Sequence, residues 1–201
     1  MKVTQEAKRA TRRRILAAAR EQFIARGFEA TTTRDLAAAA DIAKGTLFNY
    51  FENKEALAAT LVADALAAAQ EDFGKRLRGD EDLREQLFLH ISTGFRRLEP
   101  YRGFVGAVLE TALSPFAKNG VSRLGDELRM EHLDVVRELT KDDPLDVVRL
   151  HLYWTLYLGV AAFWTADDSP NQEDTLAVLD ESLRVFVLSQ SDQGGLQPSR
   201  S

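Results

Sequence analysis

Side chains that could contact a polyanion are concentrated near the start of this 201-residue chain. Residues 1–57 hold 11 Lys and Arg against 7 Asp and Glu, a formal charge of +4, whereas residues 58–201 hold 15 against 24, a formal charge of −9. Within the basic part, residues 33–54 carry hydroxyl, amide and basic side chains on a pattern of short helix, turn and short helix. Duplex DNA is read by this combination, because one helix enters the major groove, the other braces it and flanking donors contact phosphates. The charge division therefore predicts a polyanion partner for the N-terminal part.

Residue types for covalent or metal chemistry are scarce. The chain has no cysteine, which excludes disulfides, thiolate zinc sites and thiol catalysis. Its three histidines are scattered, and we find no nucleophile elbow, phosphate-binding loop, paired catalytic carboxylates or metal-spaced ligands. We therefore expect no enzyme activity, catalytic residue, metal or cofactor. The other alternative is an all-α adaptor that binds proteins through acidic helices, which would leave the basic pattern unexplained.

No segment has the pattern of a secretory signal or a membrane span. The basic start is followed by an amphipathic stretch rather than an apolar one. The longest uncharged stretch, residues 150–166, is 17 residues long, slightly shorter than a bilayer span requires, and no basic cluster flanks it. Together with the absence of cysteine, this indicates a cytoplasmic protein without membrane contact.

Helix-forming residues dominate and no alternating β pattern occurs, so the fold class is predicted to be all-α. The first helix is expected over residues 6–26, ended by Gly27. Its apolar stripe is expected to contain the following residues: Ile15, Leu16, Ala19, Phe23 and Ile24.

The next two helices are predicted from their capping and turn residues. Thr32 and Asp35 have the spacing of a capping box at the start of the second helix. Asp41 tolerates the left-handed backbone of the turn before a third helix over residues 44–50. A long helix from residue 53 or 54 to about 78 follows, and further helices are expected at 80–98, 101–114, 120–141, 144–166 and 172–189.

Residues 8–60 resemble the N-terminal domain of the tetracycline-repressor-like (TetR) family of transcriptional regulators. The resemblance is carried by TTTRDLA at 31–37, IAKGTLFNYF at 42–51 and NKEAL at 53–57, after the Arg26-Gly27-Phe28 that ends the first helix. It implies a three-helix DNA-binding domain over residues 1–53 and a larger helical ligand-binding and dimerisation domain over 54–190. Residues 191–201 are expected to form a disordered tail.

By position, the resemblance implies two kinds of DNA contact. Base-facing roles fall on Arg34, Lys44, Gly45, Thr46, Phe48 and Asn49, and phosphate-facing roles on Thr32, Thr33, Tyr50 and Lys54. Two residues depart from the family pattern: Asp41 stands where glycine is common, and Asn49 where an aromatic ring or histidine is common. Because an amide can pair with adenine or contact a phosphate, Asn49 is expected to alter the preferred operator. Leu47 and Phe51 are expected to face inward as core.

The last helices predict a subunit interface. Residues 150–166 are apolar on every side, so a partner subunit would provide the second covering surface. The 3-4-3 spacing from Leu176 to Phe186 indicates a helix–helix seam, and the resemblance likewise implies a two-fold four-helix interface. The expected interface residues are Tyr153, Tyr157, Val160, Trp164, Leu176, Leu179, Leu183 and Phe186.

A ligand pocket is expected among aromatic residues of the larger domain. The candidates are Phe88, Phe95, Tyr101, Phe104 and His132, with plain core as the alternative for each. The sequence thus predicts a homodimeric, sequence-specific regulator, a repressor by family resemblance, that binds a palindromic operator. A small apolar ligand in the helical body would modulate its DNA affinity.

Overall fold

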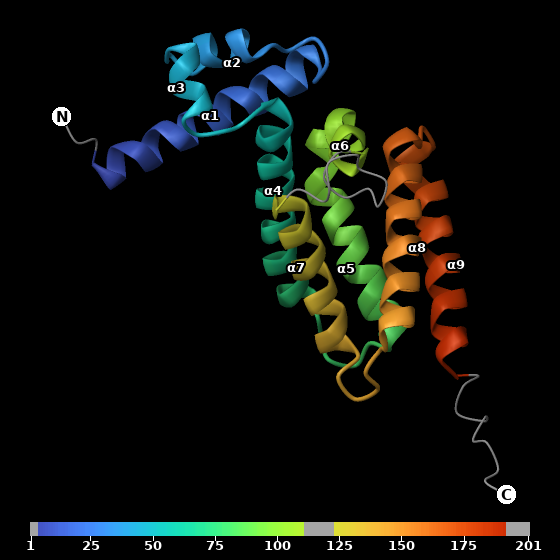
Figure 1. Cartoon of the computed structure of the whole chain (residues 1–201). Helices are drawn as coiled ribbons and strands as arrows, with labels where there is room; N and C mark the ends of the chain where they lie inside the picture. Colours follow the sequence, from blue (N-terminus) through green and yellow to red (C-terminus); the bar gives the residue numbers. More distant parts are fainter. Residues whose placement is uncertain (1–3, 111–122, 192–201) are drawn as a thin grey trace, which may run out of the picture. The chain divides into compact units, whose positions relative to one another are not determined.

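The computed structural model describes residues 4–110 and 123–191, and every regular element in these ranges is a helix (Figure 1). The fold is thus the predicted all-α class. The chain divides into two compact units, Met1–Ala68 with Arg97–Arg129 and Ala69–Arg96 with Met130–Ser201. Helices α4 (Lys54–Arg76) and α5 (Leu83–Leu98) each contribute residues to both units. The break expected between the helices at 101–114 and 120–141 lies outside the described residues, as does the expected tail over 191–201 except for Ser191, which is the last residue of α9 (Glu173–Ser191).

The first unit begins with α1 (Gln5–Arg26), α2 (Thr33–Ala39) and α3 (Lys44–Phe48). Thr4 caps α1 by accepting a hydrogen bond from the Ala7 backbone N–H at 3.2 Å, and Gly27 ends α1 with a φ of 85°. A positive φ is available to glycine without strain, which confirms its predicted role as the end of the helix. The third helix is shorter than predicted, because Asn49 already occupies its C-cap.

The core of this unit joins α1 to the two short helices. Its buried side chains include most of the predicted stripe and both predicted inward residues: Ile15, Leu16, Ala19, Phe23, Leu36, Leu47 and Phe51. The placement of Ile24 in the stripe is wrong, since Ile24 is 51% exposed. It lies next to Phe23 in sequence, about 100° further around the helix, where it leaves the buried arc.

The same unit includes η1 (Glu99–Tyr101) and α6 (Arg102–Val108). Phe104 of α6 is buried, with its ring centroid 5.3 Å from that of Phe23 and 6.3 Å from that of Phe28. Tyr101 packs on Phe104 at 5.6 Å and has the Arg20 guanidinium 5.6 Å from its ring centroid. Helix α6 therefore shares an aromatic core with the end of α1, although it is distant in sequence.

The second unit contains the end of α4, most of α5, α7 (Arg123–Leu139) from Met130 onward, α8 (Val147–Ala166) and α9 (Glu173–Ser191). Trp164 of α8 is fully buried and stacks on Phe95 of α5 at 5.1 Å. The turn between α8 and α9 is held by Asp167, whose carboxylate accepts hydrogen bonds from the backbone N–H and hydroxyl of Thr175 and from the Ser169 N–H. These donors, the Thr175 hydroxyl first, hold the pKa of Asp167 well below its usual range. No helix within the described ranges is long and apolar enough to cross a bilayer.

Candidate nucleic-acid interface

Helix α2 is fixed in place by the capping box at its start. The Thr32 hydroxyl accepts from the Asp35 backbone N–H at 3.2 Å, and the Asp35 carboxylate accepts from the Thr32 N–H at 3.0 Å and from its hydroxyl at 2.7 Å. These bonds from Thr32 are the main reason that the pKa of the Asp35 carboxyl is lowered. Orphan N–H groups at the helix start are satisfied in this way, which stabilises a helix of only seven residues.

The turn between α2 and α3 uses the left-handed backbone predicted for Asp41, which has a φ of 50°. The Ile42 N–H donates to the Ala37 carbonyl at 3.0 Å, and an Arg14 Nη donates to the Asp41 carbonyl at 3.5 Å. Leu47, with 1% of its surface exposed, anchors α3 in the core. One face of this short helix is thereby committed to packing, and the opposite face is turned to solvent.

The outward face of α3 and its flanks carries most of the side chains predicted to contact DNA. Phe48 is 46% exposed, with the Lys44 ammonium 6.0 Å from its ring centroid. A Cβ at Gly45 would meet nothing within 4 Å, so packing within the chain does not require glycine there. The exposed members of the predicted set are Thr32, Arg34, Lys44, Gly45, Phe48 and Asn49, and the partly exposed ones are Thr33, Thr46, Tyr50 and Lys54.

Two of the predicted phosphate contacts have structural roles in the domain itself. Thr32 forms the capping box. The Lys54 ammonium donates to the Phe28 carbonyl at 2.9 Å, lies 4.2 Å from the Phe28 ring centroid and is 3.8 Å from a Glu29 carboxylate oxygen. Its side chain is only 18% exposed. One of the three N–H donors of the Lys54 ammonium is therefore used within the domain.

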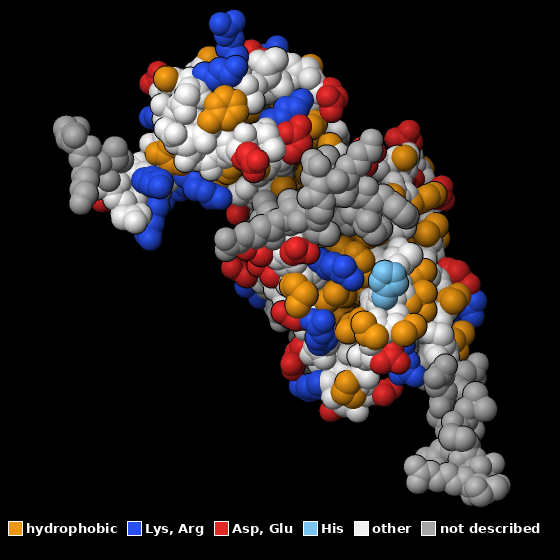
Figure 2. All heavy atoms as spheres, viewed as in Figure 1, with side chains coloured by type: hydrophobic (Ala, Val, Ile, Leu, Met, Phe, Trp, Pro, Cys, Tyr) orange, Lys and Arg blue, Asp and Glu red, His pale blue; other side chains and the backbone are white. Residues whose placement is uncertain are grey.

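The N-terminal turns of α1 form a basic surface whose individual residues were not among the predicted contacts. We name this surface the basic arm; it consists of Lys8, Arg9, Arg12, Arg13 and Arg14, all exposed. Figure 2 shows Lys and Arg side chains gathered along this end of α1. The Arg12 guanidinium lies 5.2 Å from the Phe51 ring centroid, so the arm adjoins the segment that follows α3. The signal in the sequence was five basic residues within seven positions, just before the first buried residue, Ile15.

A short exposed helix held against a braced second helix, with basic side chains on its flanks, defines a helix-turn-helix protein that binds DNA. Comparison with known proteins agrees with this class. Residues 15–61 match the family model described as bacterial regulatory proteins, tetR family. The N-terminal part of the chain, over residues 15–61, thus matches the DNA-binding domain of TetR-family transcriptional regulators.

Individual relatives extend the match beyond this domain. The transcriptional regulator QacR of Staphylococcus aureus is 25% identical over 133 residues, which cover 66% of this chain and 70% of QacR. The regulator YvkB of Bacillus subtilis is 37% identical over 86 residues, 42% of this chain and 43% of YvkB.

Solved structures share the fold along nearly the whole chain. The TetR-family repressor FadR of Thermus thermophilus matches with a TM-score of 0.67 and 24% identity, over 94% of this chain and 99% of that one. A TetR regulator of Nitrosomonas europaea matches with a TM-score of 0.64 and 20% identity, over 88% and 98% of the two chains. At this identity the matches show the fold, a TetR-type helix-turn-helix domain followed by a larger helical domain.

The structure does not bring the five predicted ligand residues together at one place. Tyr101 and Phe104 belong to the first unit, where they pack on α1. The other three belong to the second unit, where Phe95 is buried against Trp164. Phe88 lines a groove of that unit, and His132 lies in a separate aromatic cluster.

The aromatic cluster contains two histidines, His90, which is buried, and His132, which is partly buried. The ring centroids of His90 and His132 are 4.8 Å apart, and His132 Nε2 is hydrogen-bonded to the Tyr153 hydroxyl at 2.9 Å. Tyr157 lies 4.1 Å from His132, and Phe73 lies 5.1 Å from His90. Burial lowers the pKa of His90 to about 4, and burial together with His90 lowers the pKa of His132 well below its usual value. Both rings are therefore neutral at pH 7.

The structure places most of the interface residues predicted on α8 and α9 in the core of a single chain. Seven of the eight are buried there: Tyr153, Tyr157, Val160, Trp164, Leu179, Leu183 and Phe186. Only Leu176 is exposed. The apolar residues that α8 and α9 do expose include Leu152, Phe163, Val178, Val185 and Leu188. Figure 2 shows hydrophobic side chains over this part of the molecule.

Proposed function

We propose that the protein is a homodimeric, sequence-specific transcriptional repressor whose affinity for DNA is modulated by a small molecule. The observation that carries the proposal is the exposed face of α3, which is braced by a capped α2 and has no packing role in the described chain. Asn49 and Lys44 are candidates for base-edge contacts, because an amide can pair with adenine and an ammonium can donate to guanine in the major groove. FadR of Thermus thermophilus, a TetR-family repressor, supports the assignment of repression.

Phosphate contacts would come mainly from Arg34, Tyr50 and the basic arm. The exposed guanidinium groups of the arm can form charge-assisted bonds to phosphate oxygens. Lys54 makes a smaller contribution in this proposal, since its ammonium is already bonded to the Phe28 carbonyl.

Dimerisation would use the exposed apolar face of α8 and α9 rather than the buried residues of these helices. Val185 and Leu188 are 52% and 54% exposed, and Phe163 is 43% exposed. Gly159 lies on the exposed side of α8, and a Cβ there would meet nothing within 4 Å, so a partner helix could approach closely. An apolar surface of this kind is stabilised when a second copy covers it. Two copies would then present two α3 helices to a palindromic site.

Modulation by a ligand is supported by the relatives and by the contact of α6 with the DNA-binding domain. The structures of FadR from Thermus thermophilus and from Bacillus subtilis are complexes with lauroyl-CoA and stearoyl-CoA. In this chain Phe104 of α6 packs directly on Phe23 and Phe28. A ligand that binds one arrangement of the helical body more tightly than another would shift the protein toward that arrangement. The largest resulting change in the free energy of DNA binding equals the difference between the ligand's binding free energies for the two arrangements.

Selection of bound duplexes from a random pool tests the proposal. The full chain is expected to enrich an inverted repeat, because a two-fold dimer reads the same half-site twice. No enrichment above the starting pool, or enrichment of a single asymmetric half-site by a monomer, would contradict it. Sedimentation of the same preparation determines whether the bound species is a dimer.

A further inference from the structure

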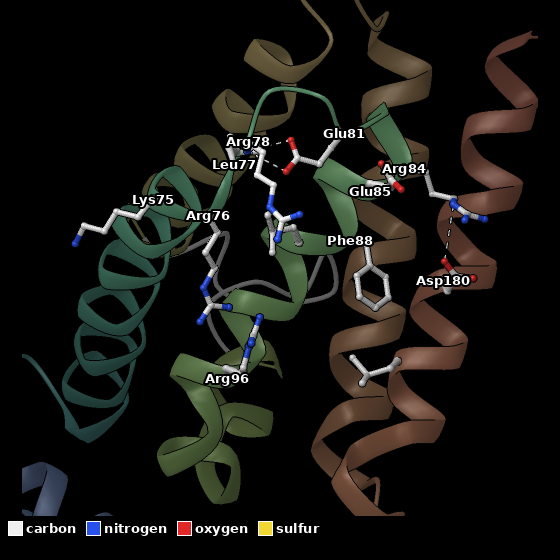
Figure 3. A pocket seen from close by; sticks show the side chains of 12 residues that line it. Lys75, Arg76, Leu77, Arg78, Glu81, Arg84, Glu85, Phe88, Arg96 and Asp180 are labelled. Atoms are coloured by element: carbon white, nitrogen blue, oxygen red, sulfur yellow. Dashed lines mark hydrogen bonds and ion pairs between the residues drawn. The ribbon is translucent and has the colours of Figure 1, made fainter.

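The second unit contains a groove of about 860 Å³ between the end of α4, helix α5 and the start of α9 (Figure 3). Of its lining residues, five are basic and three acidic, in a part of the chain that is acidic as a whole. The basic residues are Lys75, Arg76, Arg78, Arg84 and Arg96, and the acidic ones are Glu81, Glu85 and Asp180. The groove is therefore a local concentration of positive charge.

The three carboxylates of the groove already have partners. Glu81 accepts hydrogen bonds from the backbone N–H groups of Arg78 and Gly79, at 3.0 and 2.9 Å. The Asp82 N–H donates to Glu85 at 3.0 Å. The third, Asp180, forms an ion pair with Arg84 on the opposite wall, at 3.9 Å.

Arg76 and Arg96, by contrast, face each other. Figure 3 shows their guanidinium groups side by side, one from the end of α4 and one from α5. Burial and the charge of Arg76 lower the pKa of Arg96, and Asp72 offsets part of this effect. The Arg96 guanidinium donates to the neutral Thr93 hydroxyl at 3.4 Å. Two adjacent cations repel each other, and an anion bound between them would relieve the repulsion.

The rest of the groove wall is apolar. It is formed by Leu77, Phe88, Leu89 and Leu176, and Figure 3 draws the Phe88 ring on the side of α5 toward α8 and α9. A volume of about 860 Å³ lies within the range of small-molecule sites. The groove thus combines a site for an anionic head with a wall for a hydrocarbon or aryl body.

We propose that this groove binds an amphipathic organic anion, with Arg76 and Arg96 clamping its carboxylate or phosphate and Phe88 and Leu89 covering its apolar part. The guanidinium forks match both kinds of oxyanion in geometry. This inference deepens the proposed function, on which it rests, by naming a class of effector. Helix α4 begins directly after the α3 connector and ends at Arg76, so the ligand would contact the helix that leaves the DNA-binding domain.

Calorimetric titration of the full chain, without DNA, tests the proposal with four probes. Dodecanoate and lauroyl-CoA carry both an anion and a chain, dodecanol has only the chain, and coenzyme A lacks the acyl chain. Dodecanoate or lauroyl-CoA is expected to bind at least about tenfold more tightly than both controls. Dodecanol lacks the charge-assisted contact, and coenzyme A lacks the apolar contact of the acyl chain. The tighter of the two identifies carboxylate or phosphate as the head group. If the tighter of the two acyl anions bound no better than dodecanol, or no better than coenzyme A, the proposal would be overturned.

Variants assign the binding to the groove. The double variant Arg76→Gln/Arg96→Gln is expected to lose about tenfold or more in affinity for the anionic probe and to leave dodecanol binding unchanged. Arg76→Lys/Arg96→Lys, which keeps the charge but loses the fork, is expected to lie between. Arg137→Gln, an exposed arginine of α7 outside the groove, is the matched control. Equal anion affinity in the double variant and the control would overturn the proposal.

Failure of this inference and failure of the proposed function can be told apart. Probe binding is measured without DNA, and duplex selection is measured without probe. A protein that selects an operator but binds no probe through Arg76 and Arg96 remains a DNA-binding regulator, and only the effector class is then wrong. A protein that binds the probe but selects no duplex retains the groove site and lacks the proposed function.

Discussion

The buried His90, which lies against His132, makes the stability of the protein dependent on pH in a defined window. His90 is buried between Phe73 and His132, and its Nε2 is a buried atom with no hydrogen-bond partner in the described part of the chain. Protonating it would place a charge among these rings, close to His132, which itself lies against Tyr153 and Tyr157. Burial therefore lowers the pKa of His90 from 6.5 to about 4.

The sign and size of the effect follow from this shift. In the unfolded chain His90 takes up its proton near pH 6.5, and in the folded chain only near pH 4, so the unfolded state binds more protons between these values. Stability is fully present above pH 7 and falls as the pH decreases through this window. The total loss is about 3 kcal/mol, of which about 2 kcal/mol falls between pH 7.5 and 5. His132, whose pKa is lowered in the same direction, adds to this loss.

Urea unfolding at pH 7.5 and 5, at one fixed protein concentration, measures the effect. The His90→Phe variant removes the titrating ring and the unpartnered nitrogen, and it is expected to lose about 2 kcal/mol less than the wild type over this range. His151→Gln, which changes an exposed histidine, is the control and should behave as the wild type. If His90→Phe and the wild type lost the same free energy of unfolding, the account of His90 as a buried neutral group would be wrong.

Three further outcomes are expected. The double variant Arg9→Gln/Arg13→Gln changes two residues of the basic arm that are one helical turn apart and should weaken binding to all duplexes. The slope of log affinity against log salt concentration should fall in magnitude by about one for each phosphate that the variant no longer neutralises. An unchanged slope would show that these residues of the arm do not contact DNA. Asn49→Ala should cost roughly 1 to 3 kcal/mol on the selected duplex and much less on random DNA, and an equal cost on both would make Asn49 a backbone contact. Val185→Asp should give monomers in sedimentation, since a buried unpaired charge costs roughly 3 kcal/mol or more and a two-fold interface contains it twice. Met130→Asp, at another exposed apolar residue, should stay dimeric, and a dimeric Val185→Asp would refute the interface.

Local signals in the sequence were sufficient for the helix-turn-helix. The backbone and side-chain bonds that make the capping box of Thr32 and Asp35 and close the left-handed turn at Asp41 join residues at most five positions apart, so local residue types determine the geometry. The inward orientation of Leu47 and Phe51 is also a local signal, because residues about one helical turn apart face the same side. The length of α3 was overestimated by two residues, because helix ends depend on weak last-turn bonds that sequence patterns do not resolve.

Contacts between distant segments could not be read in this way. A helix that is apolar all round, such as α8, gives no sequence signal for which side meets its own chain and which side remains exposed. Its buried residues were therefore assigned to a partner. The bond from Lys54 to the Phe28 carbonyl and the juxtaposition of Arg76 with Arg96 join residues 20 or more positions apart. Only the packing of the helices brings them together.

Methylation interference on a selected duplex tests the central claim most directly, the entry of α3 into the major groove. A methyl group on guanine N7 lies in the major groove, whereas one on adenine N3 lies in the minor groove. The dimer is expected to be blocked by N7 methylation at positions in both half-sites, about 34 to 36 Å apart along the duplex. Interference by adenine N3 methylation alone, with guanine N7 methylation tolerated throughout the bound sequence, would contradict the account.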